Sequence, residues 1–249
     1  MSLQVKDLVI GEGLPKICVP ITGVTRDEIL DQGRQIAVAC PDLVEWRGDF
    51  YVDILAPGRV EEILEALSDI LGEIPILFTF RTSGEGGNRE ISTEDYRRLN
   101  LAAADQGNAS LLDVEIYKEG LNPEELIEEI HQRGGMVVAS NHHFDQTPYL
   151  MEMIEILTDM EEMEADILKL AVMPKAPEDV LNLLQATRRV SALTPRPVVT
   201  MSMGKLGVVS RISGQTFGSA ITFATVGEAS APGQIPLEEM RKILVSLDR

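Results

Sequence analysis

The apolar positions of this chain follow two patterns that alternate from end to end. Short runs of mostly apolar residues are followed by longer segments in which apolar residues recur every three or four positions. The first pattern is typical of buried strands and the second of amphipathic helices. Eight short runs predict strands at 16–21, 43–49, 75–81, 111–117, 136–142, 167–173, 197–203 and 221–226.

The segments between these runs carry the signals of helix ends. Thr25 is a suitable N-cap for a helix that follows it, because its side chain can accept a backbone N–H of the first turn. Asn122 precedes Pro123 in the same way, and Gly134 marks the end of that segment. We therefore expect a helix after almost every strand.

Eight strand–helix alternations without a linker favour a parallel sheet. That number of units predicts an α/β fold, a (β/α)8 TIM barrel that forms a single catalytic domain over residues 1–249. A doubly wound sheet is the alternative. Residues 5–13, which precede the first unit, are expected to form a hairpin that closes one end of the barrel.

Composition narrows the classes of partner. The formal charge of −18 argues against nucleic acid or an anionic membrane, both of which require clustered basic residues. No apolar run approaches the roughly 20 residues that cross a bilayer, and the N-terminus does not resemble a secretory signal. Cys18 and Cys40 lie in apolar runs and are expected to be reduced core residues. These features predict a cytoplasmic protein without a membrane partner.

Polar residues within the predicted strands keep to one face. Glu45 and Arg47 are two positions apart, as are Asp113 and Glu115, and Ser140 and His142, while Lys169 lies between Leu168 and Leu170. Alternate strand residues of a barrel point into its lumen. Most of these residues lie near the carboxyl ends of their strands, and Arg81 and Arg211 come at or after such ends. We expect them to converge on the rim where barrel enzymes place their active sites.

Each of these features also has a structural interpretation. Glu45 and Arg47 could form an ion pair that only supports the fold, and Asp113 and Glu115 could only satisfy other lumenal polar groups. His142 and His143 are adjacent and so point to opposite faces of a strand, which argues against a metal site. The glycine-rich segments 84–89 and 227–234 match no nucleotide fingerprint, and we expect them to be mobile loops above the barrel mouth.

Lys169 indicates the chemistry. Burying an ammonium without a partner is costly, so we expect burial and nearby arginines to lower the pKa of Lys169. A neutral amine forms imines with ketones, and the protonated imine makes an adjacent proton easier to remove. His142 could then act as the general base, and Arg81 and Arg211 could bind a carboxylate. The residues thus predict α-deprotonation of an oxo-acid through a lysine imine.

Eight segments together resemble the type I 3-dehydroquinate dehydratase family. They are "GEGLPKICVPI", "EWRGDF", "FTFRTSGEGG", "SNHHF", "ILKLAVMP", "TMSMGKLGVVSR", "FGSAITF" and "ASAPGQ", and they occur in order along nearly the whole chain. The resemblance implies a barrel enzyme of the shikimate pathway, usually a homodimer. It implies dehydration of the small-molecule substrate 3-dehydroquinate to 3-dehydroshikimate through a lysine imine, without a metal or an organic cofactor.

The resemblance also implies roles for individual residues. Lys169 would form the imine, His142 would be the general acid and base, and Glu85 would orient His142. The substrate-binding residues would be Glu45, Arg47, Arg81, Arg211, Ser230 and Gln234, with Arg211 on the carboxylate. Met201, Met203 and Phe223 would shape the pocket. His143 stands where many relatives have an acid, and strand parity predicts that it faces away from the lumen.

Two other functions are compatible with parts of this pattern. A lysine-dependent aldolase would share the imine but cleave a carbon–carbon bond, often with a phosphate site after the seventh and eighth strands. A barrel without activity would act as a binding or structural protein. It would have no reason to keep Lys169 in the lumen beside His142 and Arg211.

Overall fold

The computed structural model describes residues 2–105, 107–227 and 233–248. Within them, one sheet of parallel strands has the order β11-β10-β3-β4-β5-β6-β7-β8-β9. The strands from β3 to β10 are therefore neighbours in chain order, as strand–helix repeats require. They are β3 (Lys16–Ile21), β4 (Leu43–Arg47), β5 (Ile76–Thr79), β6 (Leu111–Glu115), β7 (Met136–His143), β8 (Ile167–Val172), β9 (Val198–Ser202) and β10 (Ile221–Thr225).

The sheet curls until its two ends meet. Ala220, just before β10, donates its N–H to the carbonyl of Val198 in β9 at 2.7 Å, and Ser219 forms a parallel bridge with Val198. The short strand β11 (Ile235–Pro236) adds to the free side of β10. All eight predicted strands are present within one or two residues of their predicted ends, and the barrel is confirmed over the doubly wound alternative.

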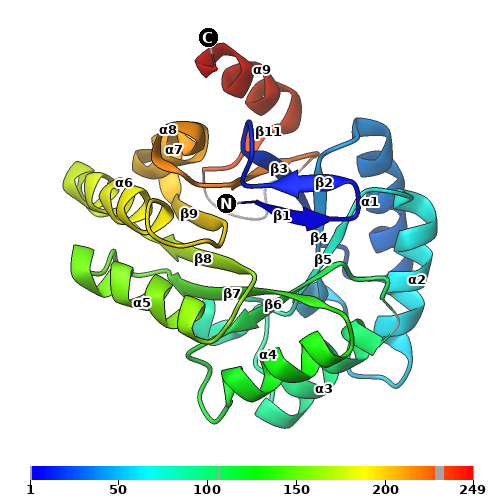
Figure 1. The fold of residues 1–249 in the computed structure, drawn as a ribbon. Helices are drawn as coiled ribbons and strands as arrows, with labels where there is room; N and C mark the ends of the chain where they lie inside the picture. The colour runs from blue at the N-terminus through cyan, green and yellow to red at the C-terminus, as the bar shows by residue number, and fades with distance from the viewer. Residues whose placement is uncertain (1, 106, 228–232, 249) are drawn as a thin grey trace.

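Helices form an outer layer around the strands (Figure 1). They are α1 (Arg26–Ala39), α2 (Arg59–Leu71), α3 (Thr93–Asp105), α4 (Pro123–Gln132), α5 (Leu150–Glu162), α6 (Pro177–Ser191), α7 (Gly204–Ile212), α8 (Gly214–Phe217) and α9 (Leu237–Leu247). Short 3₁₀ turns η1 (Gly48–Phe50) and η2 (Ser83–Glu85) follow β4 and β5. None of the helices in the described ranges is long and apolar enough to span a bilayer.

The predicted helix caps are present. Thr25 caps α1 in a capping box with Glu28, and Asn122 caps α4, accepting the N–H of Glu125. All the helices except α7 and α8 bury an apolar stripe. In α2 this stripe consists of Val60, Ile63, Leu64, Leu67 and Leu71, which follow the three- and four-residue spacing of a helix face.

A two-stranded antiparallel hairpin precedes the barrel, as predicted, but it starts and ends two to three residues earlier than the predicted range 5–13. It consists of β1 (Leu3–Val5) and β2 (Leu8–Ile10) and lies across one end of the barrel (Figure 1). Val5 and Ile10 belong to the same buried cluster as lumenal residues such as Leu43 and Ile167. The hairpin therefore closes the amino-terminal end of the lumen with apolar side chains.

The prediction that Cys40 is a core residue is wrong. Cys18 is fully buried in the lumen, but Cys40 is exposed. Cys40 ends α1 in the left-handed conformation, with φ of 51°, and its N–H donates to the carbonyl of Ile36. A residue in this position turns the chain away from the helix, which leaves its side chain in solvent although its sequence neighbours are apolar.

Candidate active site

A cavity lies at the carboxyl ends of the barrel strands. It measures about 90 Å³ and is lined by Glu45, Arg47, Arg81, Gly86, His142, Phe144, Lys169, Ala171, Met201, Met203, Arg211, Phe223 and Gln234. The strands alternate as predicted, so polar residues two positions apart share the lumen. Ten of the twelve predicted site residues line this cavity. Of the other two, Glu85 lies behind His142, and Ser230 falls outside the described residues.

Lys169 is buried at the centre of this arrangement, with a relative exposure of 4%. Its Nζ lies 3.1 Å from Oδ2 of Asp113, 3.6 Å from Oε1 of Glu45, and 5.1 Å from the centre of the Phe223 ring. The arginines expected near Lys169 do line the same cavity, but they are not its closest charged neighbours. Its closest charged neighbours are carboxylates, because the stagger of the barrel brings Asp113 of β6 towards β8.

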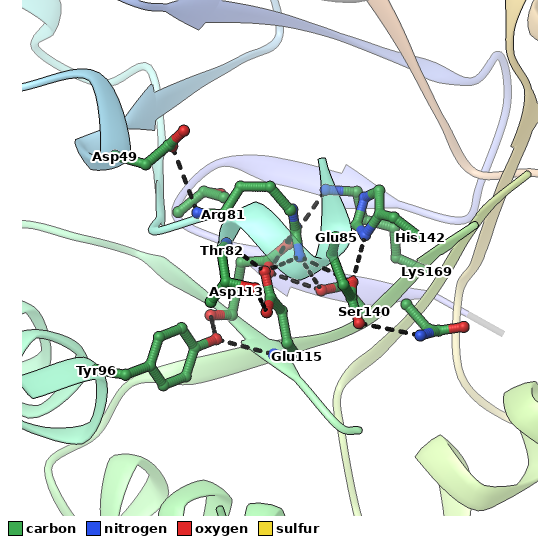
Figure 2. A network of polar contacts seen from close by, with 12 residues as sticks. Asp49, Arg81, Thr82, Glu85, Tyr96, Asp113, Glu115, Ser140, His142 and Lys169 are labelled. Carbon is green, nitrogen blue, oxygen red and sulfur yellow. Dashed lines mark hydrogen bonds and ion pairs between the residues drawn. The ribbon is translucent and has the colours of Figure 1, made fainter. Parts of the chain in front are cut away.

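Arg81 connects the acidic residues of the site (Figure 2). Its Nη2 donates to both carboxylate oxygens of Asp113 at 2.7 Å. Its Nη1 lies 2.9 Å from Glu115, 3.0 Å from the hydroxyl of Ser140 and 3.3 Å from Glu85. Both terminal nitrogens thus already donate to protein oxygens, and the substrate-binding role of Arg81 stays a prediction.

Asp113 joins the two buried cations. It accepts hydrogen bonds from Arg81 and Lys169, and its Oδ1 also accepts the hydroxyl of Ser140 at 2.7 Å. Burial opposes ionisation of Asp113, but Arg81 and Lys169 outweigh burial and hold the pKa of its carboxyl below the usual value. Asp113 is therefore a carboxylate that fixes the position of the Lys169 side chain.

His142 and Glu85 form the second pair of the site. Oε2 of Glu85 lies 2.9 Å from Nδ1 of His142, and Oε1 accepts the side-chain amide of Asn141 at 3.0 Å. Burial raises the pKa of Glu85 to about 8. Burial, together with the positive charges of Arg81 and Lys169, lowers the pKa of His142 well below its usual value. The pair therefore shares one proton near neutral pH, and Nε2 is the ring nitrogen left for a bound molecule.

Arg47 pairs with Asp49 and not with Glu45, the partner considered from the sequence. Its Nε and Nη2 donate to the two oxygens of Asp49, each at 2.7 Å. Asp49, which is fully buried in η1, also accepts the backbone N–H groups of Arg81 and Asn88. Glu45 instead accepts the hydroxyl of Thr79 at 2.9 Å and faces Lys169. Asp49 therefore orients Arg47 and anchors the loop that carries Glu85.

Arg211 reaches the cavity from α7. Its side chain is buried, and this burial lowers its pKa to about 10. Gly207 allows α7 to pack closely on the end of β9, because a Cβ at this position would lie 2.1 Å from the carbonyl oxygen of Ser202. The hydroxyl of Ser210 also accepts the N–H of Ser202 at 2.9 Å. These contacts hold the first turns of α7, and with them Arg211, beside the mouth of the barrel.

The two adjacent histidines separate as strand parity predicts. His142 lines the cavity, whereas His143 does not; both border a groove on the other side of Glu85. This groove is about 620 Å³ in volume and includes Ser83, Glu90 and Lys118. The described residues contain no cluster of three or more His, Cys, Asp or Glu suited to a metal ion.

Sequence reasoning missed three cavity residues, Gly86, Phe144 and Ala171. A Cβ on Gly86 would lie 2.2 Å from the Phe144 ring, and Gly86 has φ of 79°, so this position requires glycine. Segment 84–89 was expected to be a mobile loop above the barrel mouth that carries Glu85; its η2 turn is packed and Glu85 is buried. The glycine-rich sequence indicated a turn, while no signal in the sequence assigned Phe144 to the cavity.

Comparison with known proteins gives a consistent result. The model of the family described as type I 3-dehydroquinase matches residues 17–249. The 3-dehydroquinate dehydratase of Listeria welshimeri is 46% identical over 243 residues, which cover 98% of this chain and 96% of that protein.

Solved structures agree with the sequence relatives. The 3-dehydroquinate dehydratase of Geobacillus kaustophilus superposes with a TM-score of 0.96 at 39% identity, covering 99% of this chain and 96% of the other. The type I enzyme of Clostridium difficile gives a TM-score of 0.94 at 41% identity, covering 100% of this chain and 98% of the other. With the family model and these relatives matched over nearly their whole length, the chain belongs to the type I 3-dehydroquinase family of hydro-lyases.

Proposed function

We propose that this chain dehydrates 3-dehydroquinate to 3-dehydroshikimate through an imine with Lys169, as a step of the shikimate pathway. The observation that carries the proposal is the buried Lys169, which shares one cavity with His142 and Arg211 in a member of this family. The Clostridium difficile relative was crystallised with covalent modified comenic acid, which supports covalent chemistry in this family.

The reaction begins with the amine of Lys169. Nζ adds to the ketone carbon of the substrate, the resulting carbinolamine loses water, and a protonated imine remains. The ammonium must first lose a proton, and Asp113 at 3.1 Å is the nearest base. Glu45, at 3.6 Å, keeps a negative charge beside the iminium that forms.

His142 then removes a proton from the carbon next to the imine. Nε2 accepts this proton while Nδ1 stays bonded to Glu85, which keeps the ring in one orientation. The electron pair moves into the imine to give an enamine. Its collapse expels the hydroxyl group on the following carbon, which leaves as water with the proton from His142. Hydrolysis of the new imine consumes one water, releases the conjugated ketone and restores the amine of Lys169.

Other residues bind and enclose the substrate in this proposal. Arg211 pairs with the carboxylate, because a buried guanidinium offers forked donors to such a group. Glu45, Arg47 and Arg81 interact with the polar face of the ring, Gln234 and Ser230 cover it, and Met201, Met203 and Phe223 form the apolar wall. The domain of residues 1–249 acts as a cytoplasmic homodimer with no metal or organic cofactor.

The test is to mix purified protein with 3-dehydroquinate and no added metal. Absorbance of the conjugated enone should rise, and borohydride added during turnover should reduce the imine to a stable adduct. Peptide mass mapping should place this adduct on Lys169. An adduct on exposed Lys175, or turnover that borohydride leaves intact, would contradict the imine mechanism.

A further inference from the structure

Glu115 is a fully buried acid that does not line the catalytic cavity. It ends β6, two residues after Asp113, and three donors hold its carboxylate. They are the backbone N–H of Thr82 at 2.8 Å, the Thr82 hydroxyl at 2.7 Å and Nη1 of Arg81 at 2.9 Å. The structure thus keeps a negative charge inside the barrel wall, where an unpaired carboxylate would be costly.

A buried tyrosine fixes the backbone at this point. Tyr96 of α3 accepts the N–H of Glu115 at 2.9 Å and donates its hydroxyl to the carbonyl of Asp113 at 3.3 Å (Figure 2). Strand β6 therefore ends in a defined position, with Asp113 directed towards Lys169 and Glu115 towards Arg81. Neither Tyr96 nor Glu115 lines the cavity.

Arg81 makes the connection from Glu115 to the catalytic groups. The same Nη1 that donates to Glu115 lies 3.3 Å from Oε2 of Glu85, the oxygen that contacts His142. Glu115 and Glu85 therefore compete for one nitrogen, and their negative charges also repel each other. The charge on Glu115 weakens the hold of Arg81 on Glu85 and favours a proton on the Glu85–His142 pair.

We propose that Glu115 is a positioning residue that acts through Arg81 to set how strongly the Glu85–His142 pair holds its shared proton. The inference rests on the proposed function for its meaning in catalysis. The other charged or titratable groups that face the pair are Arg47 of β4, Arg81, Asp113 of β6, His143 of β7 and Lys169 of β8, and all of them keep their chemical identity when only Glu115 is substituted.

Glu115→Gln tests this inference, because it removes the charge and keeps the size and an accepting oxygen. Arg81 is then drawn to Glu85, and the repulsion between Glu115 and Glu85 disappears. Both changes favour ionised Glu85, so the pair loses its proton at lower pH. Since Nε2 of His142 is free to act as a base only after this loss, the acid limb of kcat should move to lower pH by at least about half a unit.

Steady-state kinetics separates this role from a purely structural one. The weaker base should lower the maximal kcat by about three- to tenfold, while KM stays within about twofold because Glu115 lies outside the cavity. Glu119→Gln is the matched control, since it removes the same charge four residues later on an exposed side chain. Its pH profile should superpose on that of the unchanged protein. A Glu115→Gln profile that does not move, or an equal shift in Glu119→Gln, would overturn the inference.

Two further variants distinguish charge from geometry. Glu115→Asp keeps the charge and should restore the midpoint to within about 0.2 units of the original. A midpoint as low as that of Glu115→Gln would exclude charge as the cause. If Glu115→Gln does not fold, Thr82→Val tests the same inference by shifting the midpoint in the opposite direction. It removes a donor to Glu115, so Arg81 should turn towards Glu115 and the midpoint should rise; an unchanged midpoint would overturn the inference.

Titration of the His142 ring nitrogens by NMR needs no substrate. It therefore tests the influence of Glu115 independently of the proposed function. The midpoint should fall in Glu115→Gln and stay unchanged in Glu119→Gln. If this shift is seen but the unchanged protein does not convert 3-dehydroquinate, the proposed function fails and the influence of Glu115 stands. If turnover is normal and the midpoint does not move in Glu115→Gln, the proposed function stands and the influence of Glu115 fails.

Discussion

Strands β4 to β8 contribute to both ends of the barrel lumen, and the side chains that they place at the two ends differ in character. In the amino-terminal half, Leu43, Leu77, Leu111, Val138 and Ile167 pack together beneath the hairpin. Two residues further along each strand, the inward positions are Glu45, Thr79, Asp113, Ser140 and Lys169, which are linked by hydrogen bonds and ion pairs.

The difference shows how one set of strands supports both stability and chemistry. Burying an aliphatic side chain stabilises a fold by about 1.5–3 kcal/mol, whereas a buried ion pair roughly balances its desolvation cost. The amino-terminal half of the lumen, called the lower half below, therefore stabilises the barrel. The carboxyl-terminal half, called the upper half, adds little net stability, and we attribute its charges to the proposed reaction.

The largest effect is expected from Lys169→Ala in the upper half. Loss of the imine-forming amine should lower kcat by at least about 10⁴-fold, and the protein should still fold because the lower half is intact. The control is Lys175→Ala, which removes an exposed lysine shortly after β8 and should keep full activity. Kinetics and circular dichroism measure both effects, and a Lys169→Ala protein that borohydride and substrate still label would contradict the role of Lys169.

Arg81→Met should show that the upper half depends on charge balance. It leaves Asp113 and Glu115 without their shared cation, and unfolding free energy should fall by about 3–5 kcal/mol in denaturant titrations. Arg97→Met breaks a partly exposed pair with Glu129 and should cost no more than about 1 kcal/mol. Equal losses in the two variants would mean that burial of the Arg81 network has no special energetic weight.

Leu111→Ala should affect the lower half alone. The cavity that it leaves should lower unfolding free energy by about 2–4 kcal/mol. Because Leu111 lies one inward position before Asp113, kcat and KM should stay within about twofold if the two halves are independent. A large loss of kcat in a folded variant would show that packing in the lower half of the lumen controls the positions of the cavity residues in the upper half.

The smallest effect is expected from His143→Ala. His143 borders the groove on the other side of Glu85 and does not line the cavity. Turnover should therefore stay within about tenfold of that of the unchanged protein, equivalent to roughly 1.4 kcal/mol. The neighbouring His142→Ala should lose several orders of magnitude and could still trap substrate as an imine. Steady-state rates, together with intact mass after borohydride treatment, compare the two. An inactive His143→Ala beside an active His142→Ala would reverse the assignment.

Local rules of the chain determined much of this protein. The alternation of short apolar runs and amphipathic segments predicted the strands and their order, and Thr25 and Asn122 marked helix starts. Parity within each strand placed Glu45, Asp113, His142 and Lys169 in the lumen, because strand side chains alternate whatever the surrounding fold. Family motifs then pointed to the cavity residues.

Tertiary structure alone decided which of these groups meet. The acidic and basic groups near one rim allow many pairings, and the choice depends on strand stagger and helix packing, which periodicity does not encode. The sequence therefore did not show that Asp49 binds Arg47, that Asp113 lies between Arg81 and Lys169, or that Gly86 makes room for Phe144. It placed Cys40 in the core because its neighbours are apolar, whereas the left-handed end of α1 turns that residue into solvent. Spacing along a strand fixes the direction of a side chain, but distances across the barrel fix its partner.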